Sequence, residues 1–292
     1  MAGQVWIFSY KLANNHTSIL RFIRNNFNEF EIEKEFPSQN RNKLFLLHKE
    51  NQRYILKIHR KSKRHSNTEV LVMSNLESQI QTPKLISYNV KSPPRYILMT
   101  YCGSRILESD NEKYYYDSGK LIAQISQISL TKSNLKTIKK KKINKIQSFI
   151  ENTQSHHPYL EYLKLYTKLS SNYFSHGDFS LDQVMVNNED SITIIDWETA
   201  CFNYRLADLA NALSHSLVIK VSTSHAQAIF AGYTSINTLS DNHEIKFLLG
   251  LIWSNLFRSK GNEISLQNPK RLAYLENLVK DRSLEKIFKL DL

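Results

Sequence analysis

The sequence lacks the features that mark membrane-spanning, exported or largely disordered proteins. None of its apolar runs approaches the roughly 20 residues that a helix needs to cross a bilayer. Met1 to Tyr10 show no charged start followed by a long apolar region, so a signal peptide is not expected. Proline, glycine and serine form no long tract, and a hydrophobic content of 41% is ordinary for a soluble globular protein. We therefore expect a folded protein without membrane insertion.

Cysteine is also scarce. The two cysteines, Cys102 and Cys201, lie far apart in the chain and show no spacing typical of a metal site. Such sparse cysteine usage fits a reducing compartment, where thiols stay free. We predict a cytoplasmic protein in which both cysteines are plain buried thiols.

Acidic residues are fewer than basic residues. The chain has 27 aspartates and glutamates against 39 lysines and arginines, a formal net charge of +12. Such a charge attracts nucleic acid, a membrane surface or an anionic substrate. Most lysines are spread among asparagine and isoleucine, and no recognition motif accompanies them, so no nucleic-acid partner is expected. The densest run, Lys139 to Lys142, is typical of a solvated helix face or connection, with contact to an anionic acceptor as the less favoured alternative.

The order of the apolar patterns predicts an α+β protein in two lobes. A chain of 292 residues is too long for one small core. Strand patterns cover residues 30–36, 43–47, 53–58 and 95–100, with a helical pattern at 68–76. Beyond Gly103 the patterns are mainly helical, at residues 118–128, 159–169, 226–233, 243–256 and 269–279. We predict that residues 1–101 form a lobe of antiparallel sheet with one helix, and that residues 102–292 form a larger, mainly helical lobe.

A predicted hairpin in the second half of the chain carries an acid at each end. Its strands are residues 184–186 and 192–195, with Asp178 before them and Asp196 after them. An antiparallel hairpin brings its two ends together, so we expect the two carboxylates to be neighbours. With the amide of Gln183 they form an oxygen-rich set that suits Mg²⁺ rather than zinc. The alternative is an ordinary surface hairpin that carries two acids.

The order of these residues resembles the phosphoryl-transfer centre of protein kinases. There the aspartate of a His-Arg-Asp loop takes the acceptor proton, and an asparagine five residues later holds Mg²⁺ together with a second aspartate. His176-Gly177-Asp178 resembles the version found in the aminoglycoside phosphotransferase and choline kinase family, which has a protein-kinase-like fold and phosphorylates small molecules. Gln183 stands where most of that family has asparagine, as in the bacterial maltokinases, and it offers the same amide oxygen on a longer stem.

This resemblance implies a role for each residue of the stretch. Asp178 would position and deprotonate the acceptor hydroxyl, while Gln183 and Asp196 would hold Mg²⁺. The supporting residues would be His176 in the loop, Glu198 beside the metal and Asp208, which begins a helix and braces the loop. A plain helix cap at Asp208 would look the same in sequence.

In the same family the first lobe binds the nucleotide. Lys57 ends an apolar strand pattern, where a buried ammonium needs a counter-charge. In kinases such a lysine grips the α- and β-phosphates and a helix glutamate holds it from behind, roles that the resemblance gives to Lys57 and Glu69. The alternative is a solvated strand lysine and a glutamate in the first turn of a helix, where the helix dipole favours it.

Two further nucleotide contacts follow from the resemblance. The connection between the first two predicted strands has no glycine, but Ser38 and Asn40 resemble the Ser/Asn-rich loop that family members fold over the ATP phosphates. Thr100 and Cys102 stand at the kinase hinge, where backbone groups hydrogen bond to adenine.

The resemblance therefore implies an ATP- and Mg²⁺-dependent kinase that transfers the γ-phosphoryl group to an alcohol of an aminoglycoside-, choline- or sugar-like small molecule. The glycine-free loop and Gln183 keep open a pseudokinase that binds a nucleotide or a partner without turnover. A protein kinase is less favoured, because no Ala-Pro-Glu segment follows Asp196. Neither the acceptor nor the oligomeric state is indicated.

Overall fold

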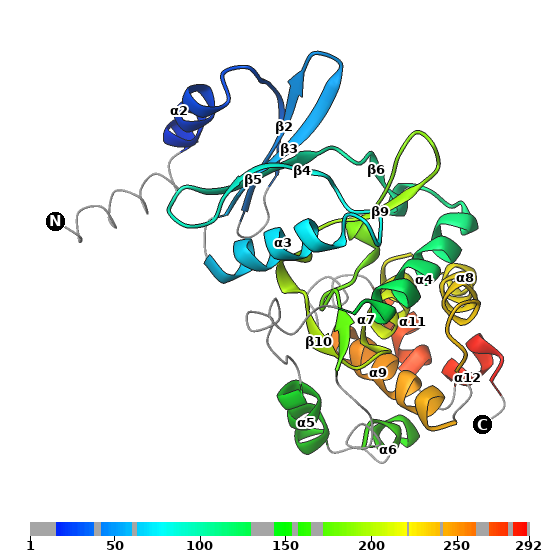
Figure 1. Ribbon diagram of the computed structural model, residues 1–292. Helices are drawn as coiled ribbons and strands as arrows, with labels where there is room; N and C mark the ends of the chain where they lie inside the picture. Colours follow the sequence, from blue (N-terminus) through cyan, green and yellow to red (C-terminus); the bar gives the residue numbers. More distant parts are fainter. Residues whose placement is uncertain are drawn as a thin grey trace. The chain divides into compact units, whose positions relative to one another are not determined.

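The chain falls into two compact units. The computed structural model describes residues 16–37, 42–59, 63–129, 143–153, 157–164, 172–220, 222–239, 242–260, 269–279 and 283–290 (Figure 1). The first unit comprises Met1–Gly103 together with Thr193–Thr199, and the second comprises Ser104–Ile192 together with Ala200–Leu292. A short segment from the second half of the chain therefore belongs to the first unit.

The first unit is built on an antiparallel sheet. Its described strands are β1 (Glu31–Phe36), β2 (Asn42–Lys49), β3 (Gln52–His59), β4 (Leu85–Asn89) and β5 (Arg95–Thr100), in the order β1-β2-β3-β5-β4 (Figure 1). Each neighbouring pair is antiparallel. The central strand β3 therefore has its backbone paired on both sides, so that a side chain on it is held firmly.

Strand β3 presents alternate side chains to two helices. Leu56 and Ile58 belong to a buried apolar cluster with residues of α2 (His16–Asn26). Successive side chains of a strand point to opposite faces. Lys57 consequently points away from α2, toward α3 (Lys63–Leu76), to which it is hydrogen bonded.

Helix α3 begins earlier than the sequence predicted. It starts at Lys63, so Glu69 lies in the middle of the helix and not in its first turn. The alternative interpretation of Glu69, stabilisation by the dipole in the first turn, is therefore wrong. The Glu69 side chain is fully buried instead.

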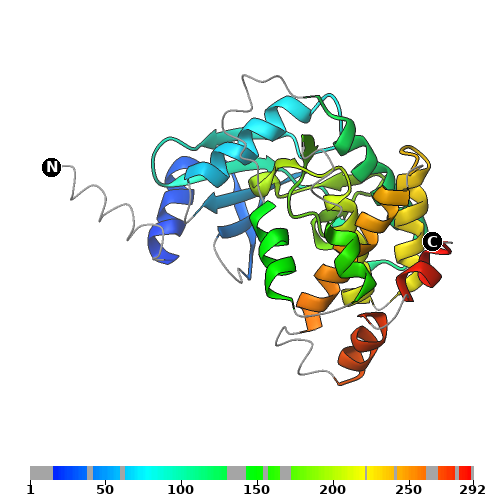
Figure 2. The same cartoon turned by 90° about the horizontal axis from the view of Figure 1, so that it is seen from below.

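The second unit is mainly helical. Its described helices are α4 (Glu112–Gln127), α5 (Ile143–Asn152), α6 (Pro158–Lys164), α7 (Ala207–His215), α8 (Thr223–Thr234), α9 (Asn242–Lys260), α11 (Pro269–Val279) and α12 (Ser283–Phe288). Helices α4 and α8 pack side by side, and α9 packs against α6, α7 and α11 (Figure 2). Helix α9 thus runs through the centre of this packing.

Short strands accompany these helices. They are β6 (Ser104–Arg105), β7 (Tyr173–Ser175), β8 (Val184–Val186), β9 (Ile192–Ile194) and β10 (Cys201–Asn203), of which β9 has its last two residues in the first unit. Strand β7 pairs antiparallel with β10, and β8 stands between β6 and β9. The predicted hairpin is therefore present, while β7 and β10 were not predicted, because three residues are too few to show a period of two.

The predicted α+β fold is confirmed, with an antiparallel sheet in the first part of the chain and helices in the second. The loop residues 38–41, the lysine run 139–142 and the end of the predicted helix, residues 165–169, lie outside the described residues. None of the helices described here is long and apolar enough to span a membrane.

Two glycines allow α4 and α8 to approach closely. A Cβ atom at Gly119 would lie 2.7 Å from the backbone nitrogen of Tyr233, and closer still to the carbonyl oxygen of Ile229. A Cβ atom at Gly232 would collide with the carbonyl oxygen of Tyr116. These neighbours are backbone atoms, which cannot move without displacing a helix.

We expect Gly119→Ala to lower the free energy of unfolding by about 1–3 kcal/mol or more, because the added methyl group forces the two helices apart. Alanine otherwise favours a helix over glycine, so a loss of stability would identify the close contact as its cause. Urea unfolding measures the effect. Gln124→Ala, at an exposed position of the same helix, should change stability by less than about 0.5 kcal/mol. A Gly119→Ala protein as stable as the wild type would show that the helices do not pack this tightly.

Candidate active site

Lys57 lies at the centre of the candidate site in the first unit. Its Nζ lies 2.8 Å from Oε2 of Glu69. The same nitrogen lies 2.6 Å from Oδ1 of Asp196 and 3.3 Å from Oε2 of Glu198. The Lys57 side chain is only 5% exposed. One buried ammonium thus meets three carboxylates.

Burial and these charges shift the pKa values of the cluster. Burial alone would lower the pKa of Lys57, but the carboxylates of Asp196, Glu69 and Glu198 hold it above its ordinary value. Burial raises the pKa of Glu69 against the opposing effect of Lys57. Burial, together with the charge of Lys57, lowers the pKa of His59 to about 3, so His59 is neutral at physiological pH.

Asp196 has an unusual backbone. Its φ angle is 67°, in the left-handed region that non-glycine residues rarely adopt, although aspartate tolerates it better than most. Holding a residue there costs about 1–3 kcal/mol, and such residues cluster at functional sites. Next to it, Glu198 accepts a 2.9 Å hydrogen bond from Nδ2 of Asn42, which anchors this segment to β2.

Three possible metal ligands gather within the part of the first unit that the structure describes. Ligand atoms of His59, Glu69 and Glu198 lie within 4.8 Å of one another. The ammonium of Lys57 contacts both carboxylates and already supplies the positive charge that they require. This group is therefore not the predicted Mg²⁺ site, which involves Asp196.

In the second unit, the side chain of Asp208 binds backbone amides of the His-Gly-Asp loop. Oδ2 of Asp208 accepts a 2.7 Å hydrogen bond from the His176 amide, and Oδ1 accepts a 3.1 Å bond from the Gly177 amide. All these groups are buried. Leu206, and not Asp208, is the N-cap of α7, so the helix-cap interpretation of Asp208 is wrong. Gly177 has a φ angle of 83°, which favours glycine at this place in the loop.

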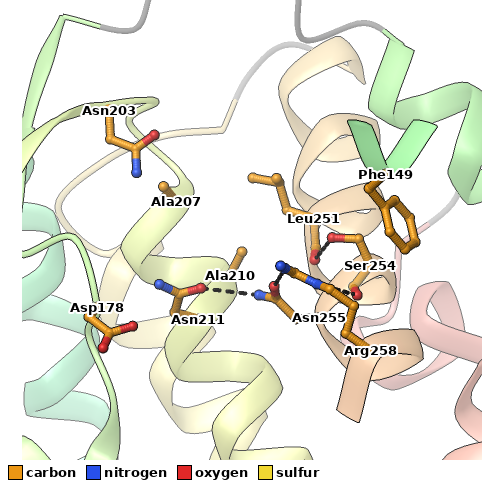
Figure 3. Close-up of a pocket in the computed structure, with 10 residues that line it drawn as sticks. All are labelled: Phe149, Asp178, Asn203, Ala207, Ala210, Asn211, Leu251, Ser254, Asn255 and Arg258. Atoms are coloured by element: carbon orange, nitrogen blue, oxygen red, sulfur yellow. Dashed lines mark hydrogen bonds between the residues drawn. The ribbon is translucent and has the colours of Figure 1, made fainter. Parts of the chain in front are cut away.

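Asp178 is exposed and directly follows these two braced residues, His176 and Gly177. Its side chain lines a cavity in the second unit, between α7 and α9 (Figure 3). The buried ring of His176 packs edge-on against Phe179, with 5.8 Å between ring centroids. Asp178 and Asp196 belong to different units, so their predicted meeting stays a prediction.

Gln183, Thr100 and Cys102 each form a hydrogen bond with a backbone group. Oε1 of Gln183, the proposed metal ligand atom, accepts a 3.2 Å hydrogen bond from the Ser180 amide. The amide of Thr100 donates to Lys84 within the sheet, and the thiol of Cys102, whose pKa burial raises to about 11, donates to the Thr100 carbonyl. Ser38 and Asn40 lie outside the described residues.

Comparison with models of protein families identifies the family of this chain. The model for the phosphotransferase enzyme family matches residues 33–248, which is more than half of the chain. This chain belongs to the phosphotransferase enzyme family. The sequence-based expectation of an enzyme of this family is thereby confirmed. Among curated protein sequences, none matches this phosphotransferase.

Solved structures show that other proteins share this fold. The GDP complex of aminoglycoside 2'-phosphotransferase-IIIa has a TM-score of 0.63 at 14% identity, covering 93% of this chain and 99% of that chain. The AMP-bound spectinomycin phosphotransferase has a TM-score of 0.60 at 15% identity, covering 94% and 98%. An ethanolamine kinase from Plasmodium vivax has a TM-score of 0.58 at 12% identity, covering 94% and 91%. At these identities the likeness shows the shared fold, which is the kinase-like fold expected from the sequence.

Sequence reasoning missed several residues of these sites. Asn42 carries no motif, and its role depends on a partner 156 residues away. Asn211, Asn255 and Arg258 line the cavity beside Asp178. A signal for the last two exists in the sequence, because they continue the spacing of Leu251 along α9, where an apolar residue would be expected.

We expect Asp208→Ala to lower the free energy of unfolding by about 1–3 kcal/mol for each of the two buried amides that it leaves without an acceptor. Asp208→Asn keeps one acceptor oxygen, so its free energy of unfolding should lie between those of Asp208→Ala and the wild type. Urea unfolding measures stability, and hydrogen exchange of the His176 and Gly177 amides locates the effect. Unchanged protection of both amides in Asp208→Ala would contradict the bracing role.

We expect His59 to make the protein less stable in acid. Its pKa is about 3 when folded and about 6.5 when unfolded, so between these values the unfolded chain binds the extra proton. The free energy of unfolding should therefore fall as the pH drops below about 6.5, by up to about 1.4 kcal/mol per pH unit from this group. Urea unfolding across this range should show a shallower slope for His59→Gln than for the wild type. His48→Gln, at a partly exposed position of β2, is the matched control, and equal slopes for both variants would refute the assignment to His59.

Proposed function

We propose that this phosphotransferase is an ATP- and Mg²⁺-dependent kinase that phosphorylates an alcohol of a small molecule. The observation that carries the proposal is the buried ammonium of Lys57, held by Glu69 and also in contact with Asp196. Membership of the family supports phosphoryl transfer. Structures of similar fold contain ADP, AMP or GDP, which supports a nucleotide as the donor here.

Lys57 would bind the nucleotide phosphates. Removing an ammonium from water is costly, and a protein that buries one between carboxylates has fixed its position closely. The direct bonds from Nζ to both oxygens of Glu69, at 3.0 and 2.8 Å, keep the lysine pointing into the site. Glu69 is thus a positioning residue. The hinge contact to adenine would come from the backbone near Cys102, because the Thr100 amide is already used in the sheet.

Asp196 and Gln183 would hold Mg²⁺. Both offer oxygen atoms, which this hard cation prefers. The strained backbone of Asp196 fits a functional role, and a carbonyl oxygen such as that of Gln183 has a second lone pair beside its bond to Ser180. When bound, Mg²⁺ neutralises charge on the phosphates. Glu198, paired with Asn42 and Lys57, would keep Asp196 in place.

Asp178 would accept the proton of the acceptor hydroxyl. In the transfer, a bond forms between the acceptor oxygen and the γ-phosphorus, and the bond from that phosphorus to the bridging oxygen of the β-phosphate breaks. ADP leaves, and the hydroxyl proton passes to the Asp178 carboxylate. Asp208 and His176 are positioning residues that fix the loop. A cytoplasmic location stays a prediction.

We expect Asp178→Asn and Asp196→Asn to fail in different ways. Asp178→Asn should lower turnover about a hundredfold or more while leaving the binding of Mg-ATP intact, because only proton transfer is lost. Asp196→Asn should lose both turnover and Mg²⁺-dependent binding. Thermal shift with Mg-ATP measures binding, since a ligand of the folded state raises the melting temperature. ATP hydrolysis measures turnover, because water can take the acceptor's place.

The control is Asp117→Asn, which removes a carboxylate paired with Lys113 on α4 and should change neither readout. Gln183→Asn should retain activity and Gln183→Leu should not, if the amide oxygen binds metal. Unaltered Mg-ATP binding by Asp196→Asn would sink the metal assignment. A wild-type protein that binds no Mg-ATP and hydrolyses none would contradict the kinase, and binding without turnover of any acceptor would favour the pseudokinase.

A further inference from the structure

The cavity beside Asp178 is formed by faces of two helices. It has a volume of about 270 Å³ and lies between α7 and α9 (Figure 3). Its helical lining residues recur three or four positions apart, at Ala207, Ala210 and Asn211 on α7 and at Leu251, Ser254, Asn255 and Arg258 on α9. One face of each helix therefore looks into it. Phe149 of α5 adds an aromatic ring.

Arg258, Asn255 and Asn211 form a chain of hydrogen bonds along the cavity wall, and the order of donors and acceptors in this chain is fixed. Arg258 can only donate, so the oxygen of the Asn255 amide must face it, as observed. The nitrogen of that amide then donates to Oδ1 of Asn211, at 3.1 Å. As a consequence, Nδ2 of Asn211 is left as a donor. Figure 3 shows this nitrogen on the side of Asn211 that faces Asp178.

This direction gives the cavity a complementary pair of groups for a hydroxyl. The Asp178 carboxylate accepts a hydrogen bond, and the Asn211 nitrogen donates one. An acceptor hydroxyl has one proton to give and lone pairs to offer, so it can bind both. Asn255 and Arg258 fix the orientation of Asn211 and thereby the polarity of the pair.

Arg258 is the second feature of the cavity. Of the lining residues that the structure describes, Asp178 and Arg258 carry charge. Among the residues that the structure describes, the hydrogen-bond acceptors of the Arg258 guanidinium are neutral: the carbonyl of Ser254, at 3.1 Å, and the amide of Asn255. Partial burial lowers the pKa of Arg258, an effect that a bound anion would reverse. A guanidinium with spare donors, whose described acceptors are neutral, is suited to a carboxylate or phosphate.

We propose that the acceptor of this kinase is a small hydroxylated anion, with its reacting hydroxyl at Asp178 and a carboxylate or phosphate group at Arg258. The inference rests on the proposed function of Asp178. A cationic acceptor would be repelled by Arg258, and the described lining residues would offer it one carboxylate, Asp178, which the reaction itself needs. The cavity volume of about 270 Å³ lies just below the range of about 300–1,000 Å³ for small-molecule sites, which favours a compound the size of a single sugar acid.

The test uses sets of compounds that share a carbon skeleton and differ in charge. Gluconate, sorbitol and glucamine form one set, and glycerate, glycerol and serinol form another, with glycerol phosphate added as the phosphate probe. The 292-residue chain is assayed for the phosphorylated product and for the change in melting temperature at millimolar concentrations of each compound, with and without Mg-ATP. We expect the anionic member of each set to bind best and to be phosphorylated best.

Arg258→Gln should raise KM for the preferred anion on the order of tenfold, because a charge-assisted bond is lost, while Mg-ATP binding stays near wild type. Arg258→Lys keeps the charge and should recover part of the loss. Lys270→Gln, which removes one exposed positive charge from α11, controls for net charge and should have no effect.

Equal or better use of the neutral or cationic members would overturn the inference. So would an Arg258→Gln variant with unchanged KM, or a protein whose melting temperature no anionic probe raises. These failures differ from failure of the kinase itself, in which Mg-ATP produces neither a thermal shift nor hydrolysis. A thermal shift by an anion that depends on Arg258 would support the anion site even then.

Discussion

The buried charge of Lys57 is the constraint on which the first unit depends. An ammonium inside a protein is tolerated when carboxylates surround it, and losing a partner costs about 3–5 kcal/mol. The partners come from α3 and from residues 193–199, far away in the sequence. This explains why a segment from the second half of the chain belongs to the first unit. A backbone bond of 3.3 Å from Ile194 to Gln81 helps to hold it there.

In the second unit the buried charged group is a carboxylate, and its partners are backbone amides. Asp208 is buried among backbone amides and fixes the two residues before Asp178. Because Asp208 belongs to α7, the same helix positions the loop and forms one wall of the cavity. The proposed base and the proposed acceptor site are therefore held by one rigid element, and a precise geometry of this kind is what phosphoryl transfer demands of a protein.

The two proposals assign phosphoryl transfer and acceptor binding to different groups of residues. Groups for the reaction common to kinases, such as Lys57 and Asp178, are recognisable from motifs. The groups proposed to bind the acceptor lie on α7 and α9 and carry no motif. A chain that shares its fold with aminoglycoside phosphotransferases at 11–15% identity can therefore differ from them in the acceptor that it binds.

Local patterns were enough to predict much of this protein. The apolar strand pattern of residues 95–100 predicted β5, and the ordered set of His176, Asp178, Gln183 and Asp196 predicted the family, because chemistry restricts which residue types occur at those spacings. Strands β7 and β10 were missed, since short strands owe their existence to pairing with distant partners.

The tertiary structure decided what local patterns could not. The start of α3 at Lys63 moved Glu69 to the middle of a helix, and packing onto β3 made it a buried partner of Lys57. Asn42, Asn211 and Arg258 carry no motif, and they belong to the proposed sites because folding places Asn42 beside Glu198 and places Asn211 and Arg258 in the cavity that Asp178 lines. The sequence by itself determined which chemical groups are available and the type of fold. Their partners, burial and direction of hydrogen bonding arise from contacts between distant segments, which no local pattern contains.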